Sequence, residues 1–165
     1  VILRSCRSMD DMVSEILHGE SKRIIPLSAL LEYVLSQASS LSWRQRVVVR
    51  GSKEDLAVPV GINLVRLSRA IVNLLENAAR ASDGAIELIF GVEGDDAVIS
   101  VRDHGPGFPE EESGAGSGWN STGIGLRYVT MVADSHGGSL STGNDPDGGA
   151  VAELRIPTGR SELRQ

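Results

Sequence analysis

Residues 67–82 (LSRAIVNLLENAARAS) restrict the possible folds more than any other part of this chain. Plotted as a helix at about 100° per residue, their aliphatic side chains fall on one side. These side chains are Leu67, Ile71, Leu74, Leu75 and Ala78. Asn73, Asn77 and Arg80 form a stripe on the other side. The sequence therefore predicts a helix with one buried face and one face of two amides and a guanidinium, although an ordinary surface helix would share this pattern.

The composition is that of one domain with an aliphatic core. The chain has 165 residues, of which 41% are apolar, and it contains only two residues each of Trp, Tyr and Phe. Its net charge of −6 argues against nucleic-acid binding, because contact with backbone phosphates requires a basic surface. We therefore expect no nucleic-acid partner, and a polyanionic ligand would need local donors or a metal ion.

The sequence shows neither a disulfide framework nor a membrane segment. Cys6 is the only cysteine, and no Cys/His cluster has the spacing of a zinc site. No apolar run approaches the roughly 20 residues that cross a bilayer, and the first residues lack the pattern of a signal peptide. We expect a cytoplasmic domain without direct membrane contact, whose parent protein could be anchored elsewhere.

Hydrophobic periodicity along the rest of the chain predicts helices interleaved with antiparallel hairpins. The expected helices cover residues 8–18, 27–39, 62–81 and 123–135. The expected strands cover residues 46–50, 85–90, 97–102, 139–142 and 150–156, with a short extended piece at 24–25 and a weaker strand at 56–58. This order predicts an α+β fold, a two-layer sandwich in which helices cover one face of a mixed, mostly antiparallel sheet.

Two glycine-rich segments follow the amide-bearing helix. In the first, RDHGPGF at 102–108, Asp103 ends a strand and precedes Gly105 and Gly107. A carboxylate there can accept a hydrogen bond from the amino group of adenine, and glycines let the backbone pass close to a flat ring. The same residues could instead form a plain turn that closes a strand.

The second segment, STGIGL at 121–126, opens a helix with Gly123, Gly125 and Leu126. The backbone N–H groups and the dipole at a helix N-terminus favour a phosphate, although a simple loop-to-helix junction has the same glycines. Between the two segments, residues 108–122 lack any apolar period. This predicts a mobile loop that is long enough to be functional.

Asn77 and Arg80 have the chemistry that the metal ion and phosphates of a nucleotide require. An amide oxygen can coordinate Mg²⁺, an ion that keeps several waters and shares phosphate oxygens. Arg80 lies one turn further along the same helix face and could contact a phosphate. Alternatively, both side chains are only solvated.

Taken together and in this order, NLLENAAR, DHGPG and TGIGL resemble the N, G1 and G2 boxes of the catalytic, ATP-binding domain of sensor histidine kinases. That domain belongs to the GHKL superfamily, with gyrase, the MutL proteins and the ninety-kilodalton heat-shock chaperones. The resemblance covers residues 24–157. Its matching residues are Asn73, Asn77 and Arg80 in the N box, Asp103, Gly105 and Gly107 in the G1 box, and Gly123, Gly125 and the adjoining Leu126 in the G2 box.

The resemblance implies a Bergerat-type ATP-binding fold with ATP and Mg²⁺ as cofactors. Asn77 would ligate Mg²⁺, and Asp103 would bind the amino group of adenine. Arg80 and the two G2 glycines would face the phosphates. Residues 108–122 would form the ATP lid.

The resemblance also implies a division of the chain and a partner domain. Residues 1–23 would be the end of a dimerisation and phosphoacceptor hairpin with its linker, residues 24–160 the ATP-binding domain and residues 161–165 a tail. The ATP-binding domain would present the γ-phosphate to a histidine on a separate helical domain of the same protein. The phosphoryl group would then pass to a response regulator.

Three features depart from the family pattern. Ala81 stands where the family often has an aromatic residue, which removes one wall of the adenine pocket. Gly149 and Ala150 replace a Gly-Thr pair, so a hydroxyl near adenine is missing. The lid lacks an F box, since Phe108 comes too early and Trp119 is the only other aromatic residue there. These differences imply weak or moderate nucleotide affinity and leave a degenerate nucleotide-binding regulatory module as an alternative.

The histidines and glutamates bear on the remaining alternatives. His18, His104 and His136 lack the sequence context of a phosphoacceptor, so the acceptor would belong to another segment. ATP-hydrolysing relatives carry a glutamate four residues before the metal-binding asparagine, where this chain has Asn73, so a clamp-type ATPase is not expected.

An anti-sigma-factor serine kinase shares the fold, but the expected helix at 8–18 resembles the phosphoacceptor hairpin and favours a histidine kinase.

Overall fold

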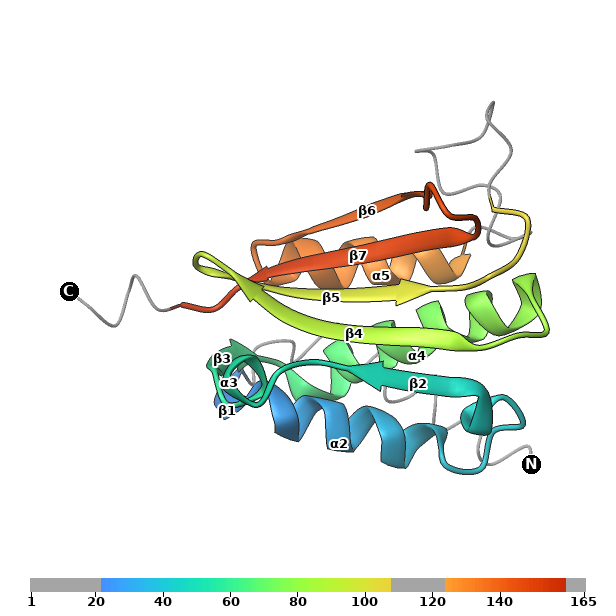
Figure 1. Ribbon diagram of the computed structural model, residues 1–165. Coiled ribbons are helices and arrows are strands. Elements are labelled where there is room, and N and C mark those ends of the chain that lie inside the picture. Colours follow the sequence, from blue (N-terminus) through green and yellow to red (C-terminus); the bar gives the residue numbers. More distant parts are fainter. Residues whose placement is uncertain (1–21, 108–123, 160–165) are drawn as a thin grey trace.

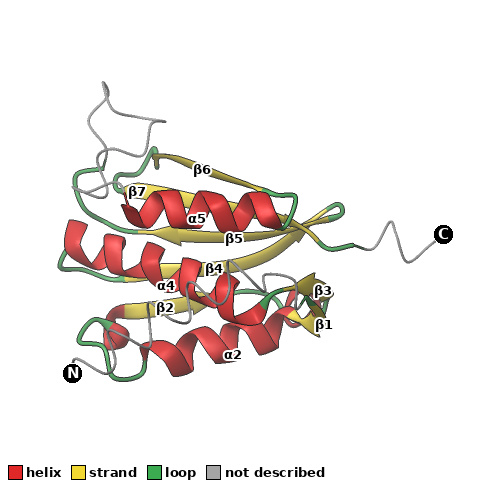
Figure 2. Cartoon of the chain, turned by 180° about the vertical axis from the view of Figure 1, so that it is seen from behind, coloured by secondary structure: helices red, strands yellow, loops and turns green. Residues whose placement is uncertain are grey.

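The computed structural model describes residues 22–107 and 124–159. In these ranges the chain forms a five-stranded sheet with helices packed against one face (Figure 1). Figure 2, which shows the molecule from behind, places α2 (Leu27–Ala38), α4 (Leu64–Ala81) and α5 (Ile124–Ser135) side by side over that face. The predicted α+β sandwich with its helices on one face is therefore confirmed.

The strand order of this sheet is β2-β4-β5-β7-β6. Its strands are β2 (Val47–Arg50), β4 (Ile86–Glu93), β5 (Asp96–Arg102), β6 (Ser139–Asn144) and β7 (Ala150–Pro157). β2 runs parallel to β4, and the other neighbouring pairs are antiparallel. A separate antiparallel pair consists of β1 (Arg23–Pro26), just before α2, and β3 (Pro59–Ile62), just before α4.

The core lies between the sheet and the three helices. Side chains alternate between the two faces of a strand, and in β4 the buried ones are Ile86, Leu88 and Phe90. The aliphatic side of α4 faces this layer as predicted, and none of its five side chains is more than 1% exposed. Burying an aliphatic side chain contributes about 1.5–3 kcal/mol, so this contact holds α4 firmly on the sheet.

The weaker strand expected at residues 56–58 is wrong. The chain instead forms a short helix, α3 (Lys53–Leu56), and the next strand begins only at Pro59. The Ser52 side chain accepts a hydrogen bond from Asp55 N at 3.1 Å, and this N-cap starts the helix. A capped first turn with two acidic residues therefore outweighs a three-residue apolar pattern.

The long helix begins two residues later than its periodicity predicts. Ile62 still belongs to β3, where it pairs with Arg23. The side chain of Asn63 then accepts a hydrogen bond from Arg66 N at 3.0 Å and caps the helix. The apolar period alone cannot locate this start, because Ile62 is buried in either assignment.

Several expected features lie outside the described residues: the helix at 8–18 with His18, the loop at 108–122 and the tail at 161–165. Among the helices of the described ranges, α4 is the longest with 18 residues, and it carries four charged side chains. None of the described helices has the length and hydropathy needed to cross a membrane.

Candidate functional site

The polar face of α4 is less exposed than its sequence suggests. Asn77 is only 2% exposed and Asn73 is half-buried, whereas Arg80 in the last turn is exposed. The Nδ2 atom of Asn77 has no hydrogen-bond partner among the described residues. A buried amide without a partner costs free energy, so such a group is expected where a ligand or water completes the site.

Asp103 directly follows β5 and is completely buried. Its Oδ1 atom accepts hydrogen bonds from Gly105 N at 2.8 Å and from Ala150 N at 3.1 Å. Its own backbone N donates to Ala150 O at 3.0 Å. The carboxylate is therefore held in a fixed orientation at the end of the sheet, as a specific acceptor for a ligand must be.

The turn after Asp103 packs against the C-terminal end of α4. A Cβ atom at Gly105 would lie 2.5 Å from Ala81 O, so this approach requires glycine. Gly107 has a φ of +78°, and a Cβ atom there would lie 2.7 Å from Asn144 Oδ1. The amide-bearing helix and the turn with the buried carboxylate thus meet at one end of the sheet, on the right in Figure 1.

Gly149 brings the β6–β7 connection against the same turn. Its φ is +92°, and a Cβ atom there would lie 2.0 Å from Asp103 O. The backbone N–H group of the next residue, Ala150, donates one of the two hydrogen bonds that Asp103 Oδ1 accepts. Sequence reasoning noted only the missing threonine hydroxyl at this pair. It missed the close approach, because a glycine pair between two strands is also an ordinary hairpin feature.

The third motif is described only in part. Gly123 lies outside the described residues, and α5 begins at Ile124 with Gly125 in its first turn. Leu126 is 5% exposed and belongs to the hydrophobic core. The N-terminal end of α5 lies at the same end of the sheet as the C-terminal end of α4 (Figure 1). The backbone N–H groups of a helix start are therefore near the carboxylate and the amide.

Charged side chains on the open face of the sheet surround Glu87 in β4. Arg50 Nε lies 2.8 Å from Glu87 Oε1. Arg102 Nε and His104 Nε2 lie 3.7 Å and 3.5 Å from Glu87 Oε2, and Arg102 also pairs with Asp145 at 3.2 Å. Arg102 and His104, which flank the buried Asp103, are thus connected by their side chains to β4 and to the residue after β6. His104 therefore lies beside a surface ion-pair cluster formed by Arg50, Glu87, Arg102 and Asp145.

His136 joins the start of α4 to the end of α5. Its Nε2 atom accepts a hydrogen bond from Asn63 N at 3.0 Å, and its Nδ1 atom lies 2.8 Å from Val132 O. With Nε2 as acceptor, the proton is assigned to Nδ1, which donates to Val132. Burial lowers the pKa of His136, and the charges of Lys22 and Arg66 act in the same direction, against the hydrogen bond to Val132. His136 is a neutral structural residue.

A metal ion at this site would need few protein ligands. The described residues contain no group of three or more His, Cys, Asp or Glu that could hold a metal ion. Mg²⁺ commonly keeps several waters and takes its other ligands from one or two side chains and from substrate phosphates. Asn77 fits this role by its residue type and its burial, because an amide oxygen can coordinate a hard cation. Its unpaired Nδ2 atom is a hydrogen-bond donor, which suits a phosphate oxygen or a water molecule rather than the metal ion.

Sequence comparisons point to one family. Residues 62–160 match the family described as histidine kinase-, DNA gyrase B-, and HSP90-like ATPase. The probable sensor histidine kinase HK of Mycobacterium tuberculosis (strain CDC 1551 / Oshkosh) is 27% identical over 155 residues, which are 88% of this chain and 40% of that protein. The sensor histidine kinase component HK1 of Mycobacterium tuberculosis (strain ATCC 25618 / H37Rv) is 32% identical over 116 residues, which are 64% of this chain and 69% of that protein.

Solved structures share the fold. The catalytic domain of histidine kinase ThkA gives a TM-score of 0.71 at 23% identity, over 84% of this chain and 97% of that one. The ATP-binding domain of PrrB from Mycobacterium tuberculosis gives a TM-score of 0.68 at 25% identity, over 84% of this chain and 98% of that one. The chain belongs to the family of histidine kinase-, DNA gyrase B- and HSP90-like ATPases.

Within this family, the relatives and the fold identify the chain as a catalytic, ATP-binding domain of the sensor histidine kinase type. The predicted Bergerat-type fold is thereby confirmed. These relatives do not favour the anti-sigma-factor serine kinase or the regulatory module without phosphotransfer.

Proposed function

We propose that this domain binds Mg-ATP at the end of the sheet where α4, the turn after β5 and the start of α5 converge. Asp103 accepts a hydrogen bond from the amino group of adenine, Asn77 ligates Mg²⁺, and Arg80 contacts a phosphate. One observation carries the proposal: a completely buried carboxylate, oriented by two backbone N–H groups, lies beside the end of a helix whose Asn77 is buried with its Nδ2 donor unpaired among the described residues.

The remaining site residues have supporting roles in this proposal. Asn73 extends the polar stripe of α4 by one turn. Gly105 and Gly107 shape the turn beside the purine, because a Cβ atom at Gly105 would collide with the Ala81 carbonyl oxygen and Gly107 has a positive φ. Gly125, followed by the core residue Leu126, lies in the first turn of α5, whose N–H groups face the phosphates in this proposal. Gly123 is assigned the same role from the sequence motif alone.

The proposed chemistry is transfer of the γ-phosphoryl group to a histidine on a separate helical domain of the same protein. Phosphoryl transfer depends mainly on positioning and charge stabilisation. Bound Mg²⁺ neutralises charge on the phosphate oxygens. Asp103 fixes the purine, and Arg80 adds a positive charge at the exposed end of α4. Hydrolysis is disfavoured, because Asn73 stands where a water-activating base would be needed and an amide is not a base.

We infer that the whole protein is a two-component sensor kinase that works in the cytoplasm. The chain spans 40% and 69% of the two mycobacterial relatives, both named as sensor histidine kinases. The phosphorylated histidine would pass its phosphoryl group to an aspartate of a response regulator. These partners suit a domain whose own fold supplies the nucleotide site and leaves the acceptor to another segment.

Titration of the chain with ATP and with ADP, each with and without Mg²⁺, tests this proposal. We expect saturable binding of weak or moderate affinity, because Ala81 and Ala150 give less contact to adenine than the family's usual residues. ATP should bind more tightly with Mg²⁺, and the Asn77→Ala variant should lose most of this difference.

Two results would contradict the proposal in different ways. If neither nucleotide binds the parent chain, the proposed nucleotide site is wrong. If the Asn77→Ala variant binds Mg-ATP like the parent, the site stands and only the metal assignment is wrong.

A further inference from the structure

The C-terminal end of α4 lacks the cap that commonly ends a helix. Helices often finish with a residue at positive φ, whose local hydrogen bonds satisfy the last carbonyl groups. Here Ser82 follows α4 in an extended conformation, with φ −150° and ψ 161°. Its backbone N still donates to Ala78 O at 3.2 Å. The carbonyl groups beyond that point are left to donors outside the helix, from other parts of the chain or from water.

Arg46 supplies such donors from a distant part of the sequence. Its Nη1 atom donates to Ser82 O at 2.8 Å and to Gly84 O at 3.1 Å, and its Nη2 atom donates to Ala79 O at 3.1 Å. A planar guanidinium can donate to several acceptors at once. Its positive charge is also favourable beside the negative end of the helix dipole.

The sheet holds Arg46 in place. This residue ends a short 3-10 helix, Arg44–Arg46, and the next residue, Val47, begins β2. Val47 pairs with Ile86, the first residue of β4, which follows the same connection that Arg46 binds. Arg46 therefore joins the edge of the sheet to the last turn of α4.

The last turn of α4 is part of the candidate site. It follows Asn77 directly and carries Arg80. The carbonyl oxygen of Ala81 lies so close to Gly105 that a Cβ atom there would be 2.5 Å away. A shift of this turn would move the amide that we assign to Mg²⁺ and would disturb the turn after Asp103.

We propose that Arg46 is a positioning residue of the nucleotide site, which holds the last turn of α4 where Asn77 can reach the metal ion of the nucleotide. This inference rests on the proposed binding of Mg-ATP. It adds a residue that lies outside the three motifs and contacts no part of the nucleotide itself.

The test compares R46Q with R44Q in the full 165-residue chain. Both variants remove one positive charge from the same short helix. Among the described residues, Arg44 makes no side-chain hydrogen bond or ion pair. The dissociation constant of ATP is measured with and without Mg²⁺, at a temperature where unfolding curves show that each variant is folded. We expect R46Q to weaken Mg-ATP binding about tenfold, as is typical for loss of a group that orients a metal ligand, and R44Q to match the parent.

The dependence on Mg²⁺ separates positioning from general stabilisation. A purely structural role would lower the unfolding temperature of R46Q but leave the affinity of the folded protein, and its ratio with and without Mg²⁺, unchanged. That result overturns the inference. Parental behaviour of R46Q in both measurements overturns it as well.

A second variant covers the case in which R46Q does not fold. R46K keeps the charge, but its single ammonium group does not reproduce the planar fork that reaches three carbonyl groups. R46K should therefore still show weakened Mg²⁺-dependent binding, and parental binding by R46K overturns the inference. If the parent chain itself fails to bind ATP, the proposed function is wrong, and the inference about Arg46, which rests on it, is wrong as well.

Discussion

At the scale of single residues, the environment of Asp103 shows how backbone groups fix the orientation of a buried side chain. Gly105 N is two residues away in the sequence and Ala150 N is 47 residues away, yet both donate to the same oxygen. The chemistry of the aspartate could be predicted from its position after a strand. The second donor could not, because nothing local to either segment indicates that they pair.

Replacing Asp103 by Asn should weaken ATP binding roughly 10- to 100-fold, since a hydrogen bond to a charged group contributes about 1.5–3 kcal/mol. The amide keeps one acceptor oxygen, which the N–H groups of Gly105 and Ala150 occupy, and places an NH₂ donor where adenine requires an acceptor. Calorimetric titration with ATP measures the loss.

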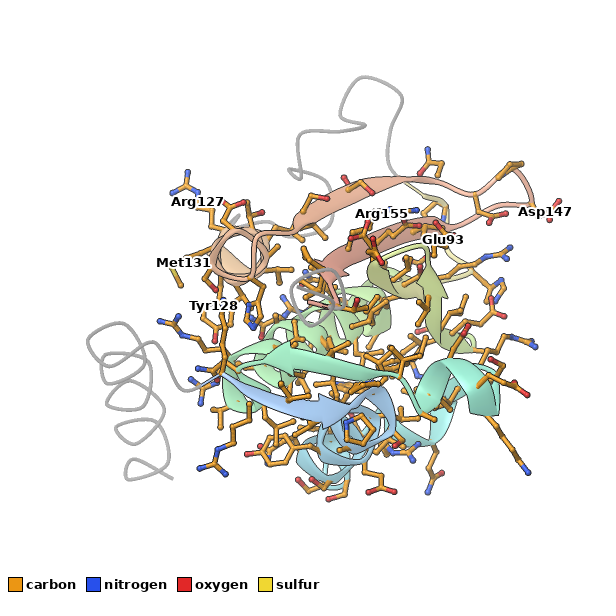
Figure 3. The ribbon with its side chains drawn as sticks, turned by 90° about the vertical axis from the view of Figure 1, so that its left-hand side faces the viewer. Glu93, Arg127, Tyr128, Met131, Asp147 and Arg155 are labelled. Carbon is orange, nitrogen blue, oxygen red and sulfur yellow. The ribbon has the colours of Figure 1, made fainter. Side chains whose placement is uncertain are left out.

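The matched control is Asp147→Asn. Asp147 is an exposed residue of the β6–β7 connection, and its side chain lies at the edge of the molecule in Figure 3. This variant should bind ATP like the parent. Equal affinities of the two variants would show that Asp103 does not contact the purine.

Replacing Gly149 by Ala should destabilise the fold by more than about 2 kcal/mol, because both the backbone and the added methyl group are strained. The residue has a φ of +92°, and its Cβ atom would lie 2.0 Å from Asp103 O. Gly148→Ala is the matched control, since Gly148 has a φ of +102° but no atom within 4 Å of a Cβ. Urea unfolding should show a clearly smaller loss for Gly148→Ala, and equal losses would contradict the role of the contact.

At the scale of the elements, the helices show which features the local hydrophobic pattern is enough to predict. The buried side of α4 could be predicted residue by residue, because the 3.6-residue period depends only on the segment itself. The cap of its C-terminal end could not, because the guanidinium of Arg46 comes from 33 residues before Ala79, one of its acceptors. The short helix α3 was missed for a different reason: the cap at Ser52 competes with a weak apolar pattern.

The junction between α4 and α5 should make stability depend on pH. Burial lowers the pKa of His136 in the folded protein below its usual value of 6.5. Below about pH 6.5 the unfolded chain therefore binds a proton that the folded chain does not. The free energy of unfolding should be highest above that pH and should fall on acidification, by up to about 1.4 kcal/mol per pH unit, until the folded protein also takes up the proton.

Urea unfolding of the parent and of His136→Gln between pH 7.5 and 5.5 measures this contribution. The variant should be less stable at pH 7.5, because it loses the hydrogen bonds by which His136 connects Asn63 to Val132. Its stability should fall less steeply on acidification. If both proteins show the same dependence on pH, protonation of His136 does not control the junction.

At the scale of the whole molecule, the strand order assembles the candidate site. β5 lies between β4 and β7, so the turn after β5 lies next to the β6–β7 connection. The same arrangement brings that turn against the end of α4 and places the start of α5 nearby (Figure 1). Motif order in the sequence predicted that three segments would converge, but the strand order decides which backbone groups meet.

The whole-molecule prediction concerns the proposed phosphoacceptor. Incubated with Mg-ATP and with the histidine-bearing helical domain that we propose as its partner, the chain should transfer phosphate to that domain. The phosphate should be labile to acid and stable to base, as phosphohistidine is, and the Asp103→Asn variant should slow its formation. Acid-stable phosphate on a serine of a partner protein would instead indicate a serine kinase.

The sequence by itself determined the two faces of α4, the hairpins, the three motifs and the family resemblance, because periodicity and motif spacing are local properties of a chain. Only the tertiary structure decided that the Nδ2 atom of Asn77 is buried without a partner in the described part of the chain, that Gly149 lies against Asp103, and that Arg46 caps the helix end. Burial and cross-chain hydrogen bonds depend on how distant segments pack together, and that packing is set by the sheet as a whole.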